Sequence, residues 1–432
     1  MKKTATYVRR VLRWIMRAIV LGVAVGFAMW ALSTCVLAMG TFREGHSFLL
    51  LFLPLAALLI TWLYQILGPY LRSGIAQVIE MINQGLLAIS MPNARKGDNE
   101  ASFISVKMAP LLFFSTILSH FVGASTGKEG AGVQIGASIG SYLSKLEDLL
   151  LPKRLEEHDA SNSGIWLISG AGAAFGALFH APVAGTLFGL QFSSPNVNRT
   201  DAFIPCLVSS YVACAFSKEV LHIHTISPPL AEAVPLRITT FLYLALLSIA
   251  FGFACKLFLF LIRSWKRFLS WRFKGVYERT LCSSILLLAL TYLFSLITGS
   301  FMLNGLSASL IGQTTQWYVP LLKMALTVVT IGSGFVGGEV IPIMVIGSTF
   351  ASLFASLLSI PASALAMFGA IGMLSAATKL PLACFMLGLE IFGYANPAAL
   401  FLVSIVSFSV SGISGIYEKQ VKTMALEEKW EV

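Results

Sequence analysis

An acidic residue lies inside a glycine-rich break between two apolar runs. The segment from Gly123 to Gly136 reads Gly-Ala-Ser-Thr-Gly-Lys-Glu-Gly-Ala-Gly-Val-Gln-Ile-Gly and places Glu129 between Gly127 and Gly130. Irregular backbone at membrane depth is tolerated only where protein buries it or a water-filled cavity solvates it. An ionisable residue there costs about 2.5–3.5 kcal/mol on insertion scales. The segment therefore indicates a permeation site, provided that the chain is a membrane protein.

Composition establishes that condition. Of 432 residues, 56% are hydrophobic and only 12% are charged, and the mean hydropathy is +0.81, which is typical of a polytopic membrane protein. Other apolar runs are shorter and contain Gly or Pro, which predicts broken helices as in transporter cores. We expect one all-α transmembrane transport domain over residues 1–432. Runs of the roughly 20 residues that a spanning helix needs lie near Ile19–Val36, Phe48–Leu67, Phe241–Phe260 and Leu281–Ile297.

The net charge of +10 is explained by membrane topology, so we expect no nucleic-acid partner. Basic residues cluster beside apolar runs, and such clusters mark cytoplasmic loops. We therefore expect both termini to be cytoplasmic and the first helix to stay uncleaved. The clusters are Arg9, Arg10, Arg13 and Arg17 before the first span, Lys153 and Arg154, and a predicted loop with Arg263, Lys266, Arg267, Arg272 and Lys274.

Two internal alignments predict a duplication. A shift of 199 residues pairs residues 170–190 with 369–389 and gives seven identities in 21 positions. A shift of 210 pairs Pro110-Leu-Leu with Pro320-Leu-Leu, Gly127 with Gly337, and Glu129 with Glu339. Together with the charge pattern, this predicts inverted repeats at residues 19–217 and 236–425 whose broken helices meet near the midplane.

Helices that begin inside the membrane offer an anion site. Their first N–H groups are unpaired and carry the positive end of the helix dipole. We expect Ser73, Gly130, Ala131, Val340 and Ile341 to contribute such groups, with Ser73 adding its hydroxyl.

A carboxylate at Glu129 would compete with a permeating anion when charged and withdraw when protonated. We therefore expect Glu129 to act as gate and proton carrier. The alternative is that Glu129 caps its own helix, because acids are common in first helical turns. For Glu339, a capping or hydrogen-bonding role is the stronger expectation.

Several motifs resemble the CLC family of chloride channels and anion/proton antiporters. Gly127-Lys-Glu-Gly130 is similar to the family's G-[RK]-E-G-P segment, and Gly337-Gly-Glu-Val-Ile-Pro342 to its G-x-F-x-P segment. Arg72-Ser-Gly-Ile-Ala76 is similar to G-S-G-I-P, and Gly415-Ile-Tyr417 lies where the family supplies a pore tyrosine. The resemblance implies a homodimer of inverted-repeat subunits, Glu129 as gating glutamate, and Ser73 and Tyr417 as anion-coordinating hydroxyls.

The resemblance leaves the ion and its coupling open. Lys107-Met-Ala-Pro110 and Ser119-His-Phe121 resemble the bacterial branch associated with fluoride export, which implies a bacterial inner or plasma membrane. That branch usually has Thr where Ile341 stands. Gln191 and Phe192 lie where chloride antiporters carry an internal proton glutamate. We expect transport of chloride or fluoride, as a channel or as a proton antiporter, without the paired regulatory cytoplasmic (CBS) domains of many members.

Rival functions have weaker support in the sequence. A secondary transporter of another solute would use the same broken helices, whereas a membrane-embedded enzyme needs a convergent nucleophile and base that we do not find. His222-Ile-His224 lies in a loop-like stretch, so surface histidines are the expected interpretation. We expect no catalytic residue, no metal and no cofactor.

Overall fold

The computed structural model describes residues 2–68, 74–90, 105, 107–150, 160–194, 199–225, 227–235, 237–305, 307–417 and 419–420, and these ranges contain helices and no β-strand. The elements are α1 (Lys2–Gly45), η1 (Ser47–Phe52), α2 (Leu53–Leu67), α3 (Ile75–Ser90), α4 (Met108–Phe121), α5 (Glu129–Leu150), α6 (Ala160–Phe179), α7 (Pro182–Gln191), η4 (Thr200–Ala202), α8 (Phe203–Ala215), η5 (Phe216–Val220), α9 (Ile238–Arg272), α10 (Val276–Thr298), η6 (Ala308–Leu310), α11 (Val319–Gly332), α12 (Val340–Ser352), α13 (Ala355–Leu358), α14 (Ala362–Thr378), α15 (Pro381–Phe392) and α16 (Pro397–Val410).

Five segments are long and apolar enough to cross a membrane. Four of them confirm the predicted spans: Val8–Gly45, Ser47–Leu67, Ile238–Arg272 and Val276–Thr298. The fifth, Thr200–Val220, was not predicted from the sequence. Seven apolar helices of 10–17 residues also occur among the described residues. These are shorter than the roughly 20 residues that a spanning helix requires, so the expected broken helices are present.

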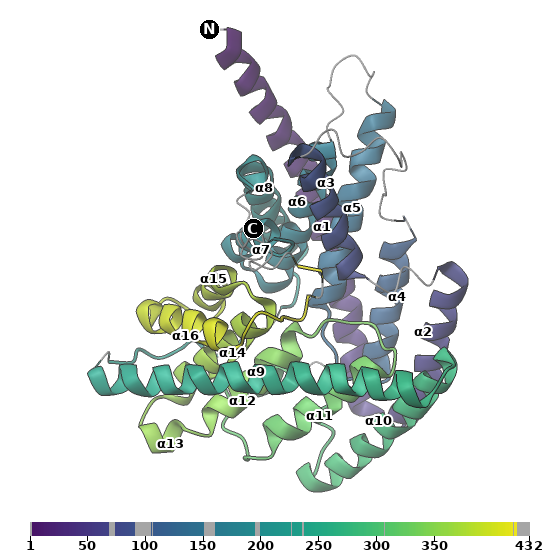
Figure 1. Cartoon of the computed structure of the whole chain (residues 1–432), viewed down its shortest axis with the longest axis vertical. Coiled ribbons are helices and arrows are strands. Elements are labelled where there is room, and N and C mark those ends of the chain that lie inside the picture. Colours follow the sequence, from purple (N-terminus) through teal and green to yellow (C-terminus); the bar gives the residue numbers. More distant parts are fainter. Residues whose placement is uncertain are drawn as a thin grey trace, which may run out of the picture.

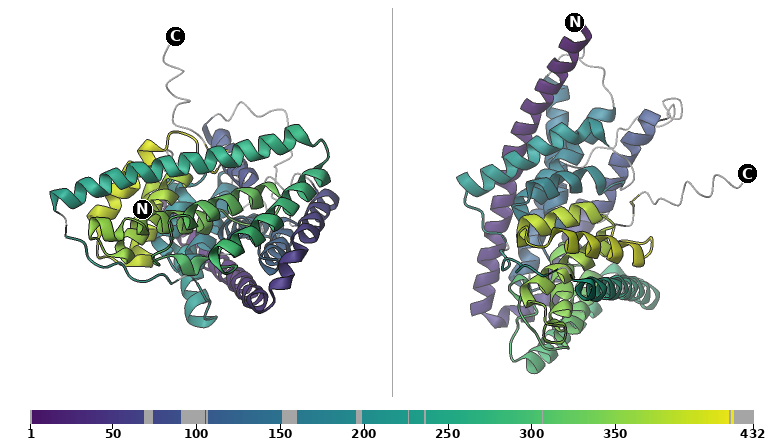
Figure 2. Two further views of the ribbon diagram at one scale, coloured as in Figure 1. Left: turned by 90° about the horizontal axis from the view of Figure 1, so that it is seen from below. Right: turned by 90° about the vertical axis from the view of Figure 1, so that its left-hand side faces the viewer.

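The helices cross at many angles and do not form a parallel bundle (Figures 1 and 2). Most of α3 to α8 lies in the upper part of Figure 1, and α9 to α16 lie below, while α1 runs through both. The long helix α9 lies across the front of the lower part. Segments from the two halves of the chain therefore meet in the middle of the molecule.

The two halves use the same close helix crossing. In α5 and α6, a Cβ atom on either Gly136 or Gly170 would collide with the other's carbonyl oxygen; in α12 and α14, Gly347 and Gly369 stand in the same relation. Because neither crossing has room for a side chain, the helix backbones pack directly against each other.

The register between the halves is 211 residues in this region, so the predicted shift of 210 is wrong by one. Gly123 and Gly334 both take positive φ values, 79° and 83°, after α4 and α11, which end at matching positions. Glu129 therefore corresponds to Val340, and Lys128 corresponds to Glu339. The error arose because Gly337 and Gly338 are adjacent, and sequence identity alone favoured the pairing that also matched two acids.

The predicted basic loop at 263–274 is mostly helix. Helix α9 continues to Arg272, and only a short turn separates it from α10. Lys and Arg have good helix propensity, and cations are favoured in the last turn by the helix dipole. The basic cluster is thus held on a rigid element.

Candidate permeation site

The glycine breaks of the two halves bind each other. Gly127 N–H donates to the carbonyl of Gly338 and Gly338 N–H donates to the carbonyl of Gly127, both at 2.6 Å, which makes an antiparallel bridge. The Thr126 hydroxyl also donates to the Gly338 carbonyl at 3.3 Å. These bonds satisfy backbone groups that would otherwise be unpaired at membrane depth.

Glycine is required here because the two backbones approach so closely. A Cβ atom on Gly130 would lie 2.9 Å from Cα of Gly338, and one on Gly337 would collide with the Thr126 hydroxyl. Such distances leave no room for a side chain. The glycines that marked the breaks in the sequence thus make the contact between them possible.

Two helices begin at this bridge. In α5 the Gly132 N–H donates to the carbonyl of Lys128, and in α12 the Ile343 N–H donates to that of Glu339, both at 2.9 Å. The preceding N–H groups have no acceptor within their own helix. They belong to Glu129, Gly130 and Ala131 in α5 and to Val340 and Ile341 in α12, while Pro342 has no N–H group.

Glu129 is the first residue of α5 and is only 1% exposed. Neither carboxylate oxygen accepts a hydrogen bond of good geometry from a described residue. A Cβ atom on Gly127 would collide with Oε2, so the carboxylate folds back against the break. Lys128 is also buried, and its Nζ donates to the Ser33 hydroxyl. Glu129 is therefore a buried acid with spare hydrogen-bonding capacity.

A cavity of about 610 Å³ opens beside the bridge. We call it the Tyr417 cavity. Of the predicted site residues, Gly130, Val340 and Tyr417 line it, and so does Glu339. Ala131 and Ile341 are buried beside Gly130 and Val340 but are not in the described lining. Ser73 lies outside the described residues, as does Arg72.

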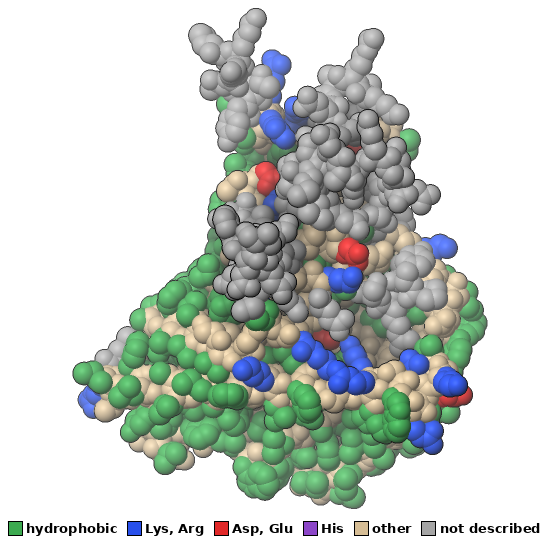
Figure 3. All heavy atoms as spheres, in the orientation of Figure 1, with side chains coloured by type: hydrophobic (Ala, Val, Ile, Leu, Met, Phe, Trp, Pro, Cys, Tyr) green, Lys and Arg blue, Asp and Glu red, His purple; other side chains and the backbone are tan. Residues whose placement is uncertain are grey.

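The mouth of the Tyr417 cavity is basic. Lys266 from α9, Arg279 from α10 and Lys419 all line it. Figure 3 shows Lys and Arg side chains gathered across the middle of this face, over α9. Clefts lined by one sign of charge raise the local concentration of the opposite ion, so this mouth favours anions.

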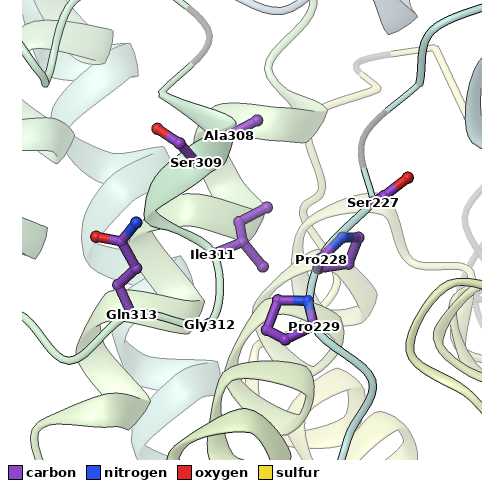
Figure 4. Close-up of a pocket in the computed structure, with 8 residues that line it drawn as sticks. All are labelled: Ser227, Pro228, Pro229, Ala308, Ser309, Ile311, Gly312 and Gln313. Carbon is purple, nitrogen blue, oxygen red and sulfur yellow. The ribbon is translucent and has the colours of Figure 1, made fainter.

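A second cavity, of about 670 Å³, lies at the carboxyl end of α1. We call it the Arg43 cavity. It is lined by the end of α1, by His120 at the end of α4, and by residues of the 300–309 segment. A smaller hollow of about 290 Å³ lies on the other side of η6, where Ile311 lies opposite Pro228 and Pro229 (Figure 4). No charged side chain is among the described residues that line this smaller hollow.

The sequence reading missed several buried polar residues. Gln134 lines the Tyr417 cavity, and its Oε1 atom has no hydrogen-bond partner among the described residues. Its spacing from Glu129 could have drawn attention to it. Arg43 and Lys323 are buried as well, but nothing in their local sequence distinguishes them.

Glu390 is the acid that corresponds to Gln191 under the shift of 199 residues. Its carboxylate accepts hydrogen bonds from the N–H groups of Val183 at 3.0 Å and Ala184 at 2.8 Å. It therefore caps the start of α7 from α15. The repeat alignment could have identified it.

Comparison with known proteins identifies the family. A family model described as voltage gated chloride channel matches residues 56–412. A chloride/fluoride channel protein of Pseudomonas syringae pv. tomato is 28% identical over 388 residues, which cover 88% of this chain and 79% of that protein. A H⁺/Cl⁻ exchange transporter of Yersinia pestis bv. Antiqua is 28% identical over 57% of this chain and 52% of its own length.

Solved structures agree with the family match. The chain is similar to a CLC-type fluoride/proton antiporter, with a TM-score of 0.84, 28% identity and coverage of 95% of this chain and 98% of that one. A slow cyanobacterial Cl⁻/H⁺ antiporter shares the fold, with a TM-score of 0.74 at 21% identity over 96% and 98% of the two chains. The CLC-like fold class predicted from the sequence is confirmed. The chain belongs to the voltage gated chloride channel family.

Proposed function

We propose that this member of the family carries halide anions across the membrane through the junction of α5 and α12, with Glu129 as its gate. The observation that carries the proposal is the burial of an acid, without a hydrogen-bond partner of good geometry among the described residues, where two helices begin. On one side of this point lies the Tyr417 cavity with its basic mouth. The geometry suits an anion and a movable carboxylate.

The anion would bind to the first N–H groups of the two helices. Those groups come from Gly130 and Ala131 in α5 and from Val340 and Ile341 in α12, and helix starts favour anions. The hydroxyls of Tyr417 and Ser73 would add donors. A charged Glu129 competes for the same donors and blocks the path, whereas a protonated Glu129 leaves the anion free to pass.

Proton coupling follows if Glu129 exchanges protons with both sides of the membrane. Of the two similar solved structures, the one at 28% identity is a fluoride/proton antiporter, which favours an antiporter over a channel. The fluoride/proton antiporter gives the higher TM-score of the two. Fluoride is therefore the second candidate ion beside chloride, although Ile341 supplies no hydroxyl.

The arrangement in the membrane follows the same proposal. Residues 19–217 and 236–425 form inverted repeats, supported by the paired glycine crossings and the matched breaks. The basic residues at the start of α1 and the end of α9 support the proposal that both termini are cytoplasmic, in a bacterial inner membrane. The subunit pairs with a second copy, and each copy carries its own pore.

Efflux from liposomes tests the substrate class. Vesicles containing the purified chain are loaded with fluoride, chloride or a larger organic anion, and release is followed with ion-selective electrodes. We expect halide release well above that of empty vesicles. Release of the larger solute with neither halide would contradict the proposal.

A further inference from the structure

The Arg43 cavity contains a buried cation with little neutralisation. Arg43 is 6% exposed, and its Nε atom has no hydrogen-bond partner among the described residues. Its only ion pair within that part of the chain is with Glu44, at 3.8 Å, and the Glu44 side chain is 72% exposed. Solvent screens such a pair strongly, so Glu44 compensates Arg43 weakly.

Lys323 is a second buried cation, and it lies behind the residues of the 303–307 segment that line the Arg43 cavity. Its Nζ donates to the carbonyls of Leu303 at 2.9 Å and Gly305 at 3.1 Å, and to the hydroxyl of Ser307 at 3.0 Å. None of the ion pairs among the described residues includes Lys323. Buried charges are normally paired, so the hydrogen bonds satisfy its donors and leave its charge uncompensated.

Both cations lie beside Gly305. Gly305 is hydrogen-bonded to Gly123, the first residue of the glycine-rich segment that contains Glu129. Arg43 Nη2 lies 3.5 Å from the place where a Cβ atom on Gly305 would be. The Gly305 N–H and the Asn304 side-chain amide both donate to the carbonyl of Gly123, at 3.3 and 3.1 Å. The cavity therefore adjoins the start of the glycine break.

His120 supplies another unpartnered polar atom to the wall. It is 2% exposed, and its Nδ1 lies 2.7 Å from the carbonyl of Thr116. Its Nε2 has no partner among the described residues. The smaller hollow beside η6, in contrast, has no charged side chain in its described lining, so of these two neighbouring cavities only the Arg43 cavity has charged residues in its described lining.

We propose that the Arg43 cavity is a second anion site, which holds a hydrated halide before it reaches Glu129. This rests on the proposed function for the identity of the anion. Helix α1 runs unbroken for 44 residues, a length of about 66 Å, so the cavity at its end opens on the membrane face opposite the amino terminus. A halide there balances the positive charges of Arg43 and Lys323 and accepts hydrogen bonds from the Arg43 guanidinium.

Gly40 allows a test that leaves every cation in place. It lines the cavity, and a Cβ atom there would have no neighbour within 4 Å. Gly40→Leu should fold, because Leu has better helix propensity than Gly, and should narrow the cavity beside Arg43, which lies three residues further along the same helix face. Gly45→Leu is the matched control, since Gly45 has equally open surroundings but is not part of the described cavity lining.

The measurement is calorimetric titration of the purified full chain with sodium chloride and sodium fluoride. We expect Gly40→Leu to bind one halide fewer per chain than the wild type, and Gly45→Leu to match the wild type. Arg43→Gln should weaken the same site about tenfold or more, and Arg43→Lys should recover part of that loss. Lys218→Gln, which removes an exposed cation outside both cavities, should change nothing.

The outcomes separate this inference from the proposed function. Equal halide stoichiometry in the wild type and in Gly40→Leu would overturn the second site, even if Arg43→Gln failed to fold. The second site would also be overturned if the cavity bound phosphate but neither chloride nor fluoride. Failure of the proposed function would appear separately, as absence of halide flux from wild-type vesicles.

Discussion

Tyr417 combines a packed ring with a position in the lining of the cavity that we propose as the anion path. Its ring meets Phe188 edge-on, with centroids 6.3 Å apart, and the residue lines the cavity beside Gly130 and Val340. The ring thus has a packing role that phenylalanine could retain. The hydroxyl is the part that the anion would use.

Tyr417→Phe should therefore weaken halide binding and leave the fold intact. Loss of one hydrogen bond is worth about 0.5–1.5 kcal/mol, which corresponds to a roughly 2- to 12-fold rise in the halide KM measured by efflux from vesicles. Tyr394→Phe is the control, because Tyr394 is exposed and does not line the cavity. An unchanged KM in Tyr417→Phe would remove this hydroxyl from the site.

Individual residues were predicted from the sequence when their chemistry stood out locally. Glu129 was recognised because an acid between glycines is costly in an apolar chain. Arg43 and Lys323 were not, because their significance depends on the 303–307 segment, which the fold brings between them. Ser73 lies outside the described residues, and its role stays a prediction.

At the scale of helices, the crossing of α5 and α6 depends on two glycines. A Cβ atom on Gly136 would lie 2.7 Å from Cβ of Ala174 and would also collide with the carbonyl of Gly170. Since α5 carries Glu129 at its start, the packing of α5 against α6 also fixes the position of this proposed gate.

Gly136→Ala should lower thermal stability. Overpacking of a tight contact costs about 1–3 kcal/mol, and the chain should unfold at a lower temperature in detergent. Gly164→Ala in α6 serves as control, because its Cβ would make an ordinary contact at 3.6 Å to Arg199. Equal melting temperatures for the two variants would show that the crossing adapts without cost.

Helix existence was more predictable than helix register. The breaks before α5 and α12 follow from Gly, Pro and charge in apolar runs. The one-residue error between the halves came from adjacent glycines, since identity cannot tell which of Gly337 and Gly338 forms the bridge. The backbone pairing of Gly127 with Gly338 is a long-range contact that local pattern does not encode.

At the scale of the whole molecule, charge on the surface should act on the rate of anion entry. Lys266 is exposed at the mouth of the Tyr417 cavity, and such charges steer ions over distances set by the Debye length. Lys266→Gln should slow halide flux at low ionic strength and have little effect at high ionic strength. Lys218→Gln should behave like the wild type at both, and a salt-independent defect in Lys266→Gln would argue against steering.

On the scale of the whole molecule, Glu129 is the one buried acid among the described residues, and it lies at a junction that both halves of the chain build. The backbones of Gly127 and Gly338 are paired at this point, and the Glu129 carboxylate lies against Gly127. If anions cross at this junction, as we propose, they must displace the Glu129 carboxylate. The coupling of anion and proton flux should therefore depend on that single side chain.

Simultaneous recording of halide and proton flux from vesicles, for the wild type and Glu129→Gln, tests this directly. In the wild type, protons should move in the direction opposite to the halide, and the halide flux should vary with pH. Glu129→Gln should move halide without protons, at a rate that no longer varies with pH. Proton coupling and pH dependence that persist unchanged in Glu129→Gln would contradict the assignment of Glu129 as the gate.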